Sequence, residues 1–234
     1  MIHLGDCLDI LPTLPDQSVD LILTDPPYFR CVAAEWDRCW PDEAAFLAWM
    51  GRVLDQFRRI LKPDGSLYLW TSPQSSWGVE GEIRQRFDVL NRIIWDKSQQ
   101  AGIHVFTQRH LLKKFFTASE ICFFSEHQQN RPRGEVGERR PFFGDKSRPH
   151  TDVWHYHVPH HHGRHICEKP MAMLADIIRT STREGALVLD AFAGSGSTGE
   201  AALSLGRRFI GIERDPEWHA KASARIGAAQ GLLF

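Results

Sequence analysis

The sequence predicts an α/β fold in which helices cover both faces of a largely parallel β-sheet. Short apolar runs typical of strands buried on both faces lie at residues 19–23, 186–190 and 209–213. Segments with apolar residues at helical spacing alternate with them, for example at residues 42–61 and 197–205. This alternation favours parallel strands, because a parallel pair needs a long crossover connection that is usually a helix.

The first half of the chain contains an apolar stretch and then clearly patterned elements. Residues 7–14 are apolar, and a Pro15-Asp16 turn leads into the strand at 19–23. Asp42 is expected to cap a long helix that ends at the sequence Lys62-Pro63-Asp64-Gly65. The segments predicted after it are a strand at 66–71, a helix at 80–87 and a strand at 89–95.

The regular pattern weakens between residues 97 and 165 and then returns. That middle stretch contains one predicted strand, at 120–125, and a polar run at 127–149 that is expected to be a loop. The elements predicted beyond it are a helix at 170–182, a strand at 186–190, a helix at 197–205, a strand at 209–213 and a final helix from Pro216. We therefore expect one domain built from residues 1–96 and 165–234, with residues 97–164 as a loop-rich insertion.

Composition limits the class of protein. A chain of 234 residues with 42% hydrophobic content is large enough for one well-packed α/β domain. The five cysteines are scattered and include no C-x-x-C pair, which indicates reduced thiols rather than a disulfide framework. No apolar run approaches the roughly 20 residues that span a bilayer, so we expect a cytoplasmic protein without membrane attachment.

Charge is distributed unevenly although the net charge is only −1. Residues 1–96 hold 9 lysines and arginines against 15 aspartates and glutamates, whereas residues 97–169 hold 12 against 7 and carry 10 of the 12 histidines. Residues 170–234 hold 7 of each kind. A basic segment in an otherwise acidic or neutral chain is the pattern expected of a segment that contacts phosphates, and a solvated surface loop is the alternative.

The tetrapeptide Asp25-Pro26-Pro27-Tyr28 follows the buried strand at 19–23. The Asp25 carboxylate can accept one hydrogen of an amino group, and a prolyl carbonyl can accept the other, which would expose the nitrogen lone pair for attack. Tyr28 offers a flat face on which a base can stack. The alternative is a stiff turn, since two prolines end a strand in many proteins.

A glycine-rich segment, residues 192–199, follows the strand at 186–190 and opens a helix. Gly194, Gly196 and Gly199 fit the pattern G-x-G-x-x-G, which lets the backbone approach a nucleotide-like ligand. Glu213 ends the next strand, and its carboxylate can accept the hydroxyl protons of a ribose. This pattern suits a dinucleotide and S-adenosylmethionine equally well.

Together with these two segments, two further motifs give the chain a family resemblance. The chain resembles the amino-methylating DNA methyltransferases that use S-adenosylmethionine, and the motif order resembles their circularly permuted beta class. The four motifs are Gly5-Asp6-Cys7, Asp25-Pro26-Pro27-Tyr28, His165-x-x-x-Lys169-Pro170 and the glycine loop at 192–198. The resemblance covers residues 1–96 and 165–226. It implies a Rossmann-like fold with a seven-stranded, mostly parallel mixed sheet, and a target-recognition segment at 97–164.

The resemblance also implies roles for individual residues. Asp25 and the Pro26 carbonyl would hold the target amino group, and Tyr28 would stack on the base, aided by Phe29. Pro27 belongs to the same catalytic motif. The residues that would bind S-adenosylmethionine are Asp6, Cys7, Lys169, Phe192, Ala193, Gly194, Ser195, Gly196, Thr198 and Glu213.

The function that the resemblance implies is methylation of adenine N6 in double-stranded DNA, after the base is extruded from the helix. Methylation of a ring carbon of cytosine needs a cysteine nucleophile, which in the carbon-methylating enzymes follows a proline, and the chain has no Pro-Cys pair. An aspartate at position 25 resembles adenine-specific members. Cytosine N4 methylation remains an alternative, as does a non-catalytic DNA-binding module. The sequence does not determine whether a cognate restriction nuclease accompanies the protein, or whether the protein is a monomer or a homodimer.

The basic middle segment offers candidate DNA contacts and a cluster of histidines. Arg139, Arg140 and Arg164 are candidate contacts to phosphate. The stretch 155–167 holds six histidines and a cysteine, but it lacks the ligand spacing of zinc sites, so we expect no metal site there.

Overall fold

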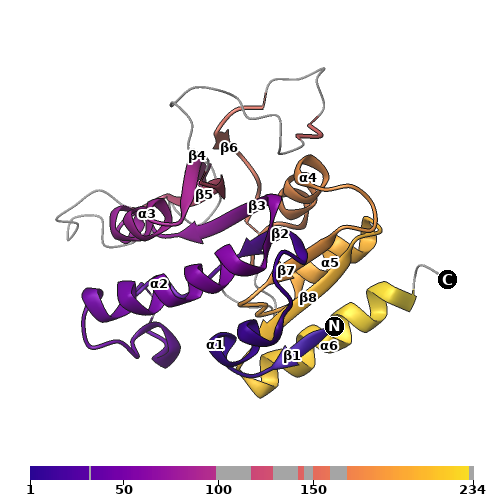
Figure 1. Ribbon diagram of the computed structural model, residues 1–234, viewed down its shortest axis with the longest axis horizontal. Helices are drawn as coiled ribbons and strands as arrows, with labels where there is room; N and C mark the ends of the chain where they lie inside the picture. The colour runs from indigo at the N-terminus through magenta and orange to yellow at the C-terminus, as the bar shows by residue number, and fades with distance from the viewer. Residues whose placement is uncertain (32, 99–116, 129–141, 145–149, 159–167, 232–234) are drawn as a thin grey trace.

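A single mixed β-sheet organises the chain (Figure 1). The structure, a computed structural model, describes residues 1–31, 33–98, 117–128, 142–144, 150–158 and 168–231. Within these residues the sheet has eight strands in the order β1-β8-β7-β2-β3-β5-β4-β6. The strands are β1 (Ile2–Leu4), β2 (Val19–Thr24), β3 (Leu61–Thr71), β4 (Phe87–Asp96), β5 (Ser119–His127), β6 (Val153–Trp154), β7 (Leu187–Asp190) and β8 (Arg208–Glu213). The helices are α1 (Cys7–Ile10), α2 (Glu43–Ile60), α3 (Ser76–Arg84), α4 (Met171–Ser181), α5 (Ser197–Ser204) and α6 (Pro216–Gly231), with short 3-10 turns at Leu11–Thr13 and Glu35–Asp37.

The direction of the strands divides the sheet into two parts. The five neighbours β1, β8, β7, β2 and β3 are parallel, so their carboxyl ends share one edge. β5 is antiparallel to both β3 and β4, and β6 pairs in parallel with β4. This confirms the predicted α/β fold with a mixed sheet. The strand number is eight rather than seven, and the short edge strands β1 and β6 had no predicted counterpart.

Two apolar cores lie on opposite faces of the sheet. Along β2, Ile22 packs with α1, α2 and α3, whereas Leu21 and Leu23 pack with α4, α5 and α6. All three side chains are almost fully buried. This burial on both faces explains why β2 reads as a continuous apolar run rather than as an alternating pattern.

Helix α2 forms as predicted at its start but ends at Ile60, and β3 begins at Leu61 rather than at 66. Helix α3 also differs. The Asp42 carboxylate caps α2 by accepting a hydrogen bond from the Ala45 N–H at 2.8 Å. For α3 the predicted range 80–87 is wrong, because the helix runs from Ser76 to Arg84. The Ser75 N–H donates to Ser72 Oγ at 3.1 Å in the turn before it, and Phe87 already belongs to β4.

The remaining predicted elements are confirmed where the structure describes them. The strand at 120–125 lies within β5, and the segments predicted at 170–182, 186–190, 197–205, 209–213 and from 216 correspond to α4, β7, α5, β8 and α6. Most of the polar run at 127–149 lies outside the described residues. None of the helices in the described ranges is long and apolar enough to cross a membrane.

Candidate active site

The carboxyl-terminal edge of the parallel strands opens into a cavity of about 560 Å³. The loops that follow β1, β2, β7 and β8 line it, together with Glu168 and Lys169 before α4 and Trp49 of α2. Loops that follow neighbouring parallel strands gather at one edge of the sheet, which is where α/β proteins bind their ligands. A cavity of this size suits a nucleoside-sized ligand.

Most of the predicted site residues meet at this cavity although they are far apart in sequence. The predicted residues that line it are Asp6, Cys7, Asp25, Pro26, Pro27, Tyr28, Lys169, Phe192, Ala193, Gly194, Ser195, Thr198 and Glu213. Gly196 lies in the same loop and packs against α6. Its φ is 78°, and a Cβ added there would lie 3.0 Å from the Cβ of Ala222.

Side chains from two other elements hold the loop that carries Asp25. The Tyr28 N–H donates to Asp37 Oδ1 at 2.9 Å, and the hydroxyl of Ser75 donates to the Tyr28 carbonyl at 2.6 Å. Phe29 and Arg30, which come next, have φ values of 61° and 60°, a left-handed conformation that is unfavourable for non-glycine residues. Asp37 is fully buried and also accepts the Arg30 N–H on its backbone carbonyl at 2.7 Å, so its contacts stabilise this turn.

The aromatic residues near this loop have different surroundings. Phe29 stacks on Phe46 of α2 with ring centroids 5.5 Å apart, which differs from the base-stacking surface expected of it. Trp95 is buried, whereas Trp77 is 84% exposed. Trp36 and Trp40 line the cavity.

Asp25 is the centre of a partly buried cluster of charged and hydroxyl groups. The hydroxyl of Tyr28 donates to Asp25 Oδ1 at 2.5 Å, and the ammonium of Lys169 donates to Asp25 Oδ2. The Lys169 ammonium also lies 5.5 Å from the centre of the Tyr28 ring. Lys169 is 4% exposed, and its ammonium contacts the predicted catalytic carboxylate, whereas the motif suggested a position beside the cofactor.

Glu120 of β5 belongs to the same cluster and had no predicted role. Its Oε2 lies 3.1 Å from the Tyr28 hydroxyl oxygen and forms an ion pair with Lys169 at 3.1 Å. Its Oε1 accepts a hydrogen bond from the Lys97 ammonium at 2.6 Å. Burial alone would raise the pKa of Glu120, but the positive charges of Lys169 and Lys97 outweigh it and lower the pKa to about 2. Glu120 is therefore a carboxylate at neutral pH.

The pKa of Asp25 shifts in the opposite direction. Burial raises this pKa, the charge and hydrogen bond of Lys169 oppose the rise, and the charge of Glu120 adds to it. The two carboxylates thus share one lysine but have different electrostatic surroundings, because Glu120 has a second lysine as a partner.

The glycine loop is held by carboxylates at the ends of β7 and β8. The Gly194 N–H donates to Glu213 Oε2 at 2.8 Å, and the Asp215 N–H donates to Glu213 Oε1 at 2.9 Å. Asp190 accepts the hydroxyl of Thr24 at 2.8 Å. Burial raises the pKa of Asp190 to about 6.

Comparison with known proteins now gives the family. The profile of the N6/N4 family described as DNA methylase matches residues 19–224. The chain belongs to this family. DNA adenine methyltransferase YhdJ of Escherichia coli (strain K12) is 30% identical over 247 residues, covering 98% of this chain and 83% of that protein.

Solved structures share the fold of this DNA methylase. The PvuII DNA methyltransferase, which is cytosine-N4-specific, matches with a TM-score of 0.76 and 19% identity over 98% of this chain and 90% of that chain. TTHA0409 of Thermus thermophilus, assigned as a DNA modification methylase and solved in complex with S-adenosyl-L-methionine, has a TM-score of 0.71 and 25% identity over 97% and 93% of the two chains. The predicted family resemblance to amino-methylating DNA methyltransferases is confirmed, whereas the permuted beta-class order stays a prediction.

Several predicted residues fall outside the described part of the structure. Arg139, Arg140 and Arg164, the expected DNA contacts, are among them, and so are His165 and most of the histidine-rich stretch. The expected recognition segment at 97–164 includes β5, which lies within the main sheet between β3 and β4. The boundaries of that segment stay a prediction.

Proposed function

We propose that this DNA methylase transfers a methyl group from S-adenosylmethionine to the exocyclic N6 of adenine in double-stranded DNA. The proposed location of the reaction is the cytoplasm. The observation that carries the proposal is that Asp25 and the glycine loop at 192–198 line one cavity. A base held by the first and a cofactor held by the second would meet within that space.

The residues that line the cavity suit this cofactor. S-adenosylmethionine, when bound, supplies an electrophilic methyl group on a positively charged sulfur. Gly194 and Gly196 have φ values of 49° and 78°, so the loop turns tightly and presents backbone rather than side chains to a ligand. Glu213 would accept ribose hydroxyl protons, Asp6 and Cys7 would lie beside the adenine of the cofactor, and Phe192 offers an aromatic face that tolerates a cation.

Asp25 and the Pro26 carbonyl would prepare the target nitrogen. In the proposed reaction each accepts one hydrogen of the amino group, so the nitrogen becomes more tetrahedral and directs its lone pair at the methyl group. Asp25 must be ionised to accept that hydrogen. The neighbouring Lys169 favours this charged form.

The target base has to leave the double helix to reach this cavity. Extrusion of a base costs a few kcal/mol, and stacking in the pocket recovers part of that cost. Tyr28 would supply the stacking face, since it is part of the same loop as Asp25 and lines the cavity.

Two observations support adenine as the target. Position 25 is an aspartate, and the 30% identical relative YhdJ is named a DNA adenine methyltransferase. The test is enzymatic digestion of DNA from cells that express the protein, followed by mass spectrometry of the nucleosides. We expect N6-methyladenine. Finding N4-methylcytosine alone would reassign the target base.

The Asp25→Ala variant tests the proposed catalytic role. We expect it to bind S-adenosylmethionine within about twofold of the parent, because the cofactor residues are unchanged. Methyl transfer should fall by at least 100-fold, the low end of the usual contribution of a group that handles protons in catalysis. Tritium incorporation into unmethylated DNA and equilibrium dialysis of the cofactor measure the two quantities.

The control is Asp64→Ala, which removes an exposed carboxylate near the amino-terminal end of β3, away from the cavity edge. It should retain the parental rate. Parental methyl incorporation in Asp25→Ala would refute the role of Asp25, and an inactive parent would refute the proposed activity.

A further inference from the structure

Both donors that occupy the Asp25 carboxylate have Glu120 as a second acceptor within reach. The hydroxyl of Tyr28 lies 2.5 Å from Asp25 and 3.1 Å from Glu120 Oε2. The Lys169 ammonium contacts Asp25 and lies 3.1 Å from the same Glu120 oxygen. Either donor can therefore change carboxylate through a small reorientation.

The proposed reaction needs such a change. Each oxygen of Asp25 already accepts a donor from the protein, Oδ1 from Tyr28 and Oδ2 from Lys169. In this partly buried site an incoming amino group competes directly with these donors for the carboxylate. A donor displaced without a new acceptor would remain buried and unpaired, which is unfavourable, above all for an ammonium.

Glu120 is suited to accept the Lys169 ammonium and the Tyr28 hydroxyl when they leave Asp25. It is held in place by Lys97 at 2.6 Å, which follows β4, and it projects from β5, whose pairing on both sides makes the strand rigid. It is ionised at neutral pH, as shown above, so it accepts hydrogen bonds only.

We propose that Glu120 is a positioning residue that takes over Lys169 and the Tyr28 hydroxyl when the target base arrives, which frees Asp25 to hold the amino group. This inference rests on the proposed role of Asp25. It also gives Lys169 a place in the reaction, as a group that keeps Asp25 ionised before the base binds and then moves to Glu120.

The charged and titratable groups that face Asp25 set the expected pH dependence. They are Lys169, Tyr28 of the same loop, Glu120 and Cys122 of β5, and Asp190 of β7. Replacing Glu120 by glutamine removes a negative charge near Asp25 and leaves Lys169 with Asp25 as its carboxylate partner in this cluster. Both changes lower the pKa of Asp25.

The test is the single-turnover rate of methyl transfer to unmethylated genomic DNA between pH 5 and pH 9, with saturating S-adenosylmethionine. For Glu120→Gln we expect a plateau rate about 10- to 100-fold below the parent, since Lys169 stays on Asp25 when the base enters. The acidic limb of the profile should move to lower pH. The dissociation constant for the cofactor should remain within about twofold.

Two further variants separate this role from damage to the fold. Glu126→Gln is the same substitution on the same strand at the opposite edge of the sheet, where β5 pairs with Asp88, and it should behave like the parent. Glu120→Asp keeps the charge and should restore the acidic limb to its parental position and part of the rate.

The outcomes distinguish this inference from the proposed function. Two results for Glu120→Gln would overturn the role of Glu120 while the parent remains an active methyltransferase. One is a rate equal to that of the parent. The other is a lower rate with an acidic limb that stays in place or moves to higher pH. A parent that methylates no DNA overturns the proposed function and this inference with it.

Discussion

Asp190 shows how one buried carboxylate can make the stability of the protein depend on pH. It ends β7 and is almost fully buried, and it accepts the hydroxyl of Thr24 at 2.8 Å and the Phe192 N–H at 3.1 Å. Burial raises its pKa from 3.8 to about 6. The folded protein therefore binds this proton more tightly than the unfolded chain does. The stabilisation from the proton is complete below pH 3.8 and is lost as the pH rises through 6.

The Asp190→Asn variant should remove this dependence, because asparagine keeps an acceptor oxygen but does not titrate. We expect the free energy of unfolding of the parent, relative to the variant, to decrease by at most roughly 3 kcal/mol between pH 4 and pH 8. Urea denaturation at both pH values measures it. A difference that is the same at pH 4 and pH 8 would contradict the raised pKa.

At the scale of elements, the turn from β7 into α5 depends on Gly196. Its positive φ disfavours any residue with a Cβ, and a Cβ there would press on Ala222 of α6. The close approach of α5 and α6 and the shape of the glycine loop thus rest on the same residue.

Replacing Gly196 by alanine should weaken both the packing of α5 against α6 and the binding of the cofactor by the glycine loop. We expect a loss of about 1–3 kcal/mol of stability from backbone strain and at least a tenfold weaker affinity for S-adenosylmethionine. Thermal unfolding and equilibrium dialysis measure these. The control is Gly227→Ala in α6, where a Cβ would meet no atom within 4 Å and where alanine should stabilise the helix by up to about 1 kcal/mol. Unchanged cofactor affinity in Gly196→Ala would show that the loop tolerates a Cβ.

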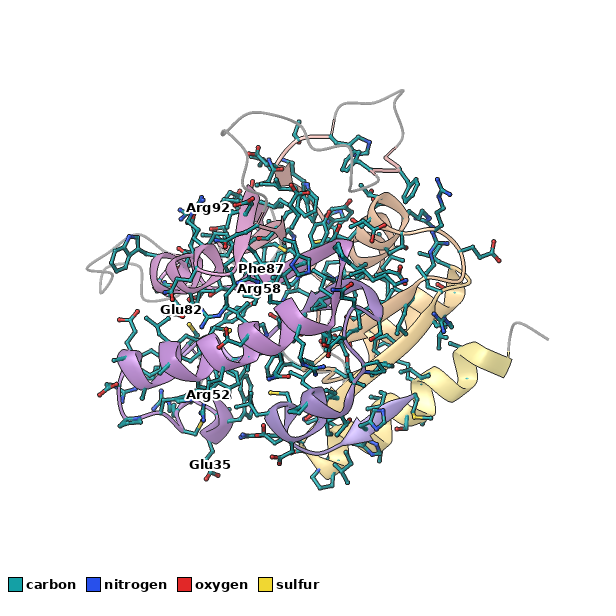
Figure 2. All side chains as sticks on the ribbon, in the orientation of Figure 1. Glu35, Arg52, Arg58, Glu82, Phe87 and Arg92 are labelled. Carbon is teal, nitrogen blue, oxygen red and sulfur yellow. The ribbon has the colours of Figure 1, made fainter. Side chains whose placement is uncertain are left out.

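At the scale of the whole molecule, positive charge is concentrated in the middle of the sequence. If residues 97–164 contact DNA, replacing Arg139 and Arg140 by alanine should weaken binding, and the plot of log affinity against log salt should flatten by about 2 units of slope. The matched control replaces Arg52 and Arg58, two exposed arginines of α2 (Figure 2). Fluorescence anisotropy with a labelled duplex gives the slopes. Equal slopes for the Arg139/Arg140 variant and the parent would place the DNA contacts elsewhere.

The layout of the molecule follows from its sequence more completely than the contents of the site do. The strands at 19–23 and 186–190 and the two loops after them were predictable because continuous apolar runs and glycine or proline motifs are local signals. β1 has no local signal, because two half-buried residues and one exposed residue carry no periodicity. Glu120 was missed because its role depends on a partner 92 residues away, Tyr28, which only the antiparallel insertion of β5 beside β3 brings close.

The central position of β5 sets a rule for transplanting sequence specificity between relatives. An exchange of residues 97–164 as one block would replace β5, and with it both Glu120 and the strand that joins β3 to β4. If the residues on either side of β5 select the duplex, a chimaera that grafts foreign sequence there while leaving Lys97 and Ser119–His127 native would change that selection and keep the contact between Lys97 and Glu120.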